Sequence, residues 1–166
     1  MSSTASQPAR AHQQTGPDAA AWAERLRVAN INPRTGLATD YLNHFNEAVM
    51  LLEMIPDMPE CAEDFLTWTP LSYAEHFTAS NFKAKELAIE AYEKADPSVR
   101  TQFDNIVNTL HSILTAVGKA MREVEKDSTR VRLAEQATLW VQPLIAACGG
   151  IIHGGADADV DSIMSS

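Results

Sequence analysis

The segment 97–126 carries the regularity that most constrains the fold. Its large apolar residues recur at alternating steps of three and four, as on an α-helix with one buried face; they are Phe103, Ile106, Leu110, Ile113, Val117 and Met121. Pro97 suits the first turn of such a helix, and Lys126-Asp127-Ser128 would end it. No segment alternates apolar and polar residues between turn signals, as a half-buried strand would. The sequence therefore predicts an all-α protein.

Three further segments show the same helical spacing. They cover residues 39–55, which Pro56 would end, residues 72–95, and residues 128–151. The connections between these helices are short, and short connections favour antiparallel neighbours. We therefore expect an antiparallel up-down four-helix bundle, with at most a short helix in the proline-rich connector at 56–70.

The 166 residues suit one domain, which we place at 21–153. Residues 1–20 are rich in Ser, Ala, Gln, Thr and Pro, so we expect a disordered arm, and we expect 154–166 to form a short, flexible, acidic tail. The chain shows no secretory signal at its start and no apolar run of membrane-spanning length. Two cysteines, Cys61 and Cys148, are too few for a disulfide framework. We expect a bacterial, cytoplasmic protein.

The distribution of charge restricts the choice of partner. The formal net charge is −9, which argues against nucleic acid, because phosphate binding requires a surface of Lys and Arg. Residues 36–82 contain eight acidic residues and no Lys or Arg. A surface of one sign attracts partners of the opposite sign. We therefore expect a protein partner, one that could present a basic surface.

The sequence favours a protein that is not an enzyme. It contains no nucleophile elbow, phosphate-binding loop, dinucleotide fingerprint or H-E-x-x-H motif, so no cofactor is expected. Cys61 lies beside Glu60 and Glu63, and neighbouring carboxylates raise the pKa of a thiol and suppress its reactive thiolate. Cys148 falls on the apolar face of the last helix and is expected in the core.

One polar ridge could serve phosphosignalling. Asp104, Asn108, His111 and Thr115 follow one another at helical steps beside the apolar face of 97–126. The segment LHSILTAVG around His111 resembles the motif of histidine phosphotransfer domains, although Leu114 and Thr115 replace that motif's Lys and Gly. This resemblance implies an exposed His111 that accepts a phosphoryl group. Asp104 and Asn108 have the one-turn spacing of the acid and amide in helical phosphatases of response regulators. An ordinary solvent-exposed ridge is the alternative.

A metal-binding bundle is the competing interpretation. Di-iron bundles require Glu-x-x-His pairs on two helices, and this chain has one pair in the reverse order, His44-x-x-Glu47. Helix heights place Glu53, His76 and His111 near one end of an up-down bundle. These residues could converge on one or two metal ions. His76 and His111 could equally be half-buried residues with hydrogen-bonded rings.

Protein–protein contact is the function that the sequence favours. Methionine and aromatic residues gather around the first connector, within the acidic stretch; they are Met50, Met54, Met58, Phe65, Trp68 and Leu71. Such residues can form an adaptable groove for a basic amphipathic helix, or they can close one end of the core. We expect a regulatory, interaction-based function, and the sequence leaves the oligomeric state open.

Overall fold

The computed structural model describes residues 16–155, and all the secondary structure in this range is helical. It has seven α-helices and two 3₁₀-helices: α2 (Pro17–Val28), η2 (Thr39–Tyr41), α3 (Leu42–Met54), η3 (Pro59–Cys61), α4 (Ala62–Thr67), α5 (Tyr73–Ala79), α6 (Lys85–Glu93), α7 (Pro97–Glu123) and α8 (Asp127–Ile152). The all-α prediction is confirmed for this part of the chain. None of these helices combines the length and apolar character needed to cross a membrane.

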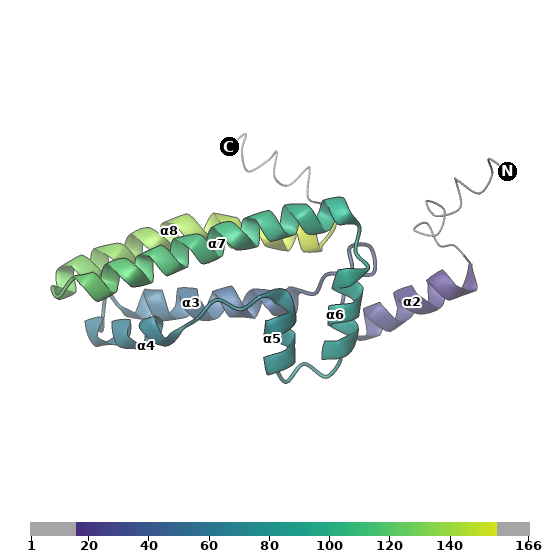
Figure 1. Cartoon of the computed structure of the whole chain (residues 1–166), viewed down its shortest axis with the longest axis horizontal. Helices are drawn as coiled ribbons and strands as arrows, with labels where there is room; N and C mark the ends of the chain where they lie inside the picture. Colours follow the sequence, from purple (N-terminus) through teal and green to yellow (C-terminus); the bar gives the residue numbers. More distant parts are fainter. Residues whose placement is uncertain (1–15, 156–166) are drawn as a thin grey trace.

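The two longest helices, α7 and α8, lie side by side along the long axis of the molecule (Figure 1). α3 packs against α8, and α4 packs against both α3 and α7. α5 and α6 form a hairpin that runs across this axis. Because α5 and α6 stand beside the start of α7, they form a junction there that holds the candidate site.

The buried face of α7 is rotated slightly from the one that the spacing predicts. Leu110 is fully buried, as expected, but Val107 and Leu114 are buried in place of Ile106 and Ile113. Ile106 and Ile113 are half-buried and pack against the edge of the core. The period was therefore right, and the buried face is rotated slightly towards Val107 and Leu114, while Phe103, Leu110, Val117 and Met121 stay within it as predicted.

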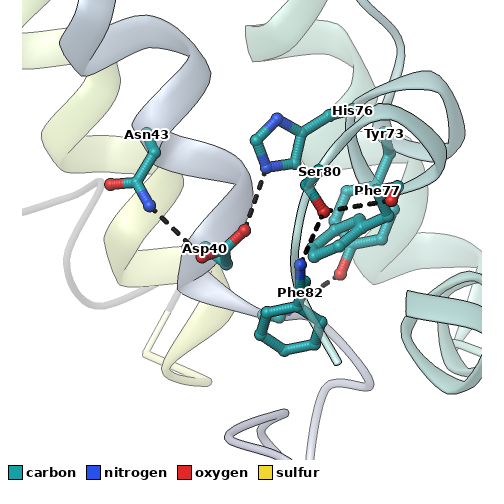
Figure 2. A network of polar contacts seen from close by, with 8 residues as sticks. Asp40, Asn43, Tyr73, His76, Phe77, Ser80 and Phe82 are labelled. Atoms are coloured by element: carbon teal, nitrogen blue, oxygen red, sulfur yellow. Dashed lines mark hydrogen bonds and ion pairs between the residues drawn. The ribbon is translucent and has the colours of Figure 1, made fainter. Parts of the chain in front are cut away.

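The helix predicted over 72–95 is wrong as a continuous element. It is divided into α5 and α6, with residues 80–84 between them. The Ser80 hydroxyl donates to the Phe77 carbonyl over 3.0 Å and accepts the Phe82 N–H over 3.1 Å (Figure 2). A serine that bonds the backbone locally competes with the helical hydrogen bonds. The Phe77 and Phe82 rings then meet edge to face across the turn.

The first helix begins earlier than the sequence suggests. Residues 17–20, which we assigned to a disordered arm, form the first turn of α2. Pro17 and Asp18 suit that turn, because proline fixes a helical φ and an acid favours the helix N-terminus. Leu26 is buried. Residues 1–15 of the expected arm and 156–166 of the expected tail lie outside the described residues.

The turn at Asn32–Gly36 joins α2 to the rest of the core. The buried Thr35 hydroxyl donates to the Ile152 carbonyl over 2.7 Å, so it satisfies an acceptor at the end of α8. Gly36 has a φ of 75°, and a Cβ there would lie 2.9 Å from the Ala91 carbonyl oxygen. Glycine is therefore required where this turn meets α6.

Candidate functional site

Three histidines from three different helices lie close together beside the α5–α6 hairpin. His44 comes from α3, His76 from α5 and His111 from α7. The ring centre of His44 is 5.2 Å from that of His111 and 6.3 Å from that of His76. The sequence places His76 and His111 at one end of a bundle, and the structure adds His44 to them.

His44 is held by the segment that connects α4 to α5. Its Nε2 accepts the Leu71 N–H over 3.1 Å, and its carbonyl accepts the Trp68 indole N–H over 3.1 Å. The His44 and Trp68 rings stack with their centres 4.7 Å apart. His44 is only 4% exposed. Burial, reinforced by His111 and His76, lowers the pKa of His44 to about 3, so its imidazole is neutral at neutral pH.

His111 forms a direct pair with His44. Their Nε2 atoms are 3.1 Å apart. Because His44 Nε2 already accepts the Leu71 N–H, it carries no proton, and His111 Nε2–H must be the donor. Burial lowers the pKa of His111, and Glu75 opposes this shift. Phosphoryl transfer to Nε2 of His111 would therefore require this contact to break.

His76 faces a carboxylate instead of the other two histidines. Figure 2 shows its Nε2 directed at Asp40, with 3.0 Å between Nε2 and Oδ2. An ionised carboxylate only accepts hydrogen bonds, so this His76 nitrogen carries the proton. Asp40 also accepts a hydrogen bond from the Asn43 side chain. Asp40 was not among the residues that sequence reasoning selected.

A cavity of about 420 Å³ adjoins His111. Its wall includes residues from α5, α6 and α7, among them Tyr73, Tyr92, Asp104, Asn108 and His111. The predicted ridge on α7 therefore does line one site, except for Thr115, which lines a second, smaller cavity of about 150 Å³. A volume near 400 Å³ lies in the range of small-molecule sites.

The phenol group of Tyr92 holds the Asp104 side chain in the wall of the cavity. The Tyr92 hydroxyl donates to Asp104 Oδ1 over 2.7 Å, and the Tyr92 ring stacks on Tyr73 with centres 4.6 Å apart. Burial raises the pKa of the Tyr92 phenol, and the neighbouring Asp104 raises it further. Burial also raises the pKa of Tyr73. Both phenols are therefore neutral, and each stays a hydrogen-bonding group.

The other proposed metal ligands lie apart from the histidines. Glu47 and Glu53 are both exposed on α3, and Glu53 accepts a hydrogen bond from Gln142 on α8. His44 and Glu47 therefore point to different sides of the same helix. Within residues 16–155, no group of three or more His, Cys, Asp or Glu side chains is placed to hold a metal ion.

Sequence reasoning missed the aromatic part of the site. Tyr41, Tyr73 and Tyr92 line the cavity, but on the helical pattern they are ordinary apolar positions. One available signal was the run Asp40-Tyr41-Leu42-Asn43-His44, which places two ionisable side chains one turn apart. The contributions of Trp68 and Leu71 depend on how the connector packs, and no local pattern encodes that.

A second surface feature lies over α3 and α8. Leu139 and Trp140 on α8 are 71% and 52% exposed, and Met50 on α3 is 55% exposed. The hydrogen bond between Gln142 and Glu53 brings the exposed sides of the two helices together. Met50 lies one turn before Glu53, and Leu139 lies one turn before Gln142. Met50 and Leu139, with Glu53 and Gln142, form what we call the α3–α8 surface, and Trp140 is exposed on the other flank of α8, about 160° from Gln142 around the helix.

The two cysteines are both free and buried. Burial raises the pKa of Cys148 to about 12. Burial also raises the pKa of Cys61, with Asp64 and Glu60 adding to the effect. Neither thiol has the low pKa of a reactive cysteine.

Comparison of the chain with protein-family models, curated proteins and solved structures gave no match.

Proposed function

We propose that this is a cytoplasmic binding protein that acts through protein–protein contacts and has no catalytic activity of its own. The observation that carries the proposal is the α3–α8 surface, where large apolar side chains of two adjacent helices are left exposed. Exposed apolar residues that gather in this way are typical of interaction sites. Methionine is also enriched where proteins bind one another.

The charge around this surface supports a basic partner. Glu47, Glu53 and Asp57 are exposed near the Met50 side of the surface, and Glu135 is exposed one turn before Leu139. Arg132, one turn further from Leu139, is the nearest exposed cation on that face of α8. An apolar strip with an acidic margin complements an amphipathic helix with basic flanks. A second copy of this acidic chain would be repelled.

The first test uses a synthetic amphipathic helix of Leu and Lys, and a matched peptide in which Glu replaces every Lys. We expect calorimetry to detect binding of the Lys peptide only. Leu139→Ser should weaken that binding about tenfold or more, as truncation of a central apolar contact does. Val28→Ser is the matched control, because Val28 is 75% exposed but lies on α2.

Three results would contradict the proposal: binding of both peptides equally, binding of neither, or an equal loss in the Leu139→Ser and Val28→Ser variants. Circular dichroism would establish that each variant is folded.

Phosphosignalling through His111, Asp104 or Asn108, and metal binding, have less support. The His111 Nε2 is paired with His44, and Asp104 is paired with Tyr92. No specific observation favours either activity over binding.

We also propose that the architecture is a modified four-helix bundle. In this interpretation, α4 and α5 together replace the fourth long helix beside α3, α7 and α8. The contacts of α4 with both α3 and α7 support it.

A further inference from the structure

The cavity at the α5–α6–α7 junction is open to solvent and has both aromatic and polar residues in its wall. Tyr41 and Phe103 are fully buried, and Tyr73 is 4% exposed. Glu75 and Asn108, which line the same cavity, are exposed. Tyr41 and Phe103 therefore lie behind the cavity wall, out of reach of a ligand, and the half-buried Tyr92 supplies an accessible aromatic ring. A ligand that fits it combines an apolar body with a polar head.

The charges that line the cavity are all of one sign. Its ionisable residues include two carboxylates, Glu75 and Asp104, and neither Lys nor Arg is among the lining residues. His111 adds no positive charge at neutral pH, because burial lowers its pKa. Arg100, whose Cζ lies 5.9 Å from the centre of the Tyr92 ring, donates its hydrogen bonds to the carbonyl groups of Tyr92 and Glu93 at the end of α6. An anionic ligand would therefore meet repulsion without a compensating cation.

Both carboxylates keep a free capacity to accept hydrogen bonds. The Tyr92 hydroxyl bonds Oδ1 of Asp104, and the Ser72 N–H bonds Oε1 of Glu75. Each carboxylate has a second oxygen with further lone pairs. These two fixed bonds also orient the side chains before a ligand arrives, which reduces the entropy lost on binding.

We propose that this cavity binds a small organic ammonium ion with an apolar or aromatic body. The ammonium group lies at the mouth between Asp104 and Glu75 and donates hydrogen bonds to them. The body of the ligand packs against the exposed part of the Tyr92 ring. Aromatic faces also attract a cation directly. This site is separate from the α3–α8 surface, so either proposal can fail without the other.

The test compares three probes of one shape by calorimetry on the full chain: phenethylammonium, phenethyl alcohol and phenylacetate. We expect phenethylammonium to bind at least tenfold more tightly than the neutral alcohol, because a hydrogen bond to a charged group is stronger than a neutral one. Phenylacetate should bind least. Calcium chloride is the fourth titrant, because an inorganic cation could use the same two carboxylates.

Two variants remove charge and keep the hydrogen-bond acceptors. Asp104→Asn can still accept from Tyr92, and Glu75→Gln preserves the cap at the start of α5, where Gln serves as well as Glu. Each should weaken phenethylammonium binding about tenfold or more. Glu86→Gln on α6 is the control, since it removes the same charge from an exposed residue outside the cavity lining, and it should leave the affinity unchanged.

The proposal is overturned if phenethylammonium does not bind at millimolar concentration, or if it binds no better than the alcohol. Tighter binding of calcium than of phenethylammonium would assign the carboxylates to an inorganic cation. An equal loss in Glu86→Gln and Asp104→Asn would mean that the attraction depends on net charge and not on the cavity. If Asp104→Asn does not fold, Glu75→Gln decides the result alone.

Discussion

His44 is the single residue through which most of the site is connected. It joins α3 to α7 through His111 and to the connector through Leu71 and Trp68. The sequence pairs His44 with Glu47 because they are three positions apart on one helix, but packing buries His44 and leaves Glu47 exposed. Residue spacing predicts which side chains could meet on a helix. It does not predict which face the rest of the chain covers, so the partners of His44 could not be foreseen.

The low pKa of His44 predicts that acid destabilises the fold. The unfolded imidazole, with a pKa of 6.5, binds a proton that the folded imidazole, with a pKa of about 3, does not accept. Below pH 6.5 the unfolded state therefore binds more protons, and the free energy of unfolding falls as the pH falls towards 3. His111 contributes in the same direction, because its pKa is also lowered.

Urea unfolding of the wild type and of His44→Gln over this pH range checks the prediction. His44→Gln should be less stable at neutral pH, because it loses the aromatic ring that stacks on Trp68, and its stability should decline less steeply in acid. Parallel pH profiles for the two proteins would contradict the pKa assigned to His44.

At the scale of elements, the sequence predicts helices well and their interruptions poorly. The bounds of α3, α7 and α8 lie close to those expected, because the apolar residues in all three have a strong helical periodicity. Pro56 also marks the end of α3, and Pro97 marks the start of α7. The division of α5 from α6 was missed because apolar residues keep a helical spacing across it. Both helices of the hairpin turn their apolar faces, Phe77 on one and Ala88 on the other, into the same core.

The rotation of the buried face of α7 can be tested by comparing substitutions at two adjacent residues, Ile113 and Leu114. Leu114 is 2% exposed, whereas Ile113 is half-buried. Leu114→Ala should lower the free energy of unfolding by about 2–5 kcal/mol, as large-to-small core changes do, and Ile113→Ala by clearly less. Urea unfolding of both variants measures the difference. A larger loss for Ile113→Ala would return the apolar face to the position that the spacing predicts.

The Asn32–Gly36 turn makes a second prediction at this scale. Gly36→Ala should destabilise the protein by about 1 kcal/mol or more, because the residue has a positive φ and its new Cβ would contact the Ala91 carbonyl. Gly16→Ala is the comparison, since Gly16 also has a positive φ but has open space around its Cβ position. Equal effects in thermal melts would mean that backbone strain, and not contact with α6, dominates.

At the scale of the whole molecule, the charge distribution was predictable and the two candidate binding regions were not. The absence of Lys and Arg from residues 36–82 can be read directly from the sequence. This acidic stretch indicates a particular binding surface only in the folded chain, where α3 lies beside α8 and Leu139 and Trp140 are exposed. The cavity similarly depends on the α5–α6 hairpin, which no local pattern predicts.

The central claim is that the α3–α8 surface is the part of the molecule that binds a partner. The most direct measurement is the change in backbone amide NMR shifts when the Lys and Leu peptide is added to the full chain. We expect the largest changes around Met50 and Leu139, with residues of α2 unaffected. Changes concentrated on α2 or α6, or no changes at a peptide excess, would contradict the account.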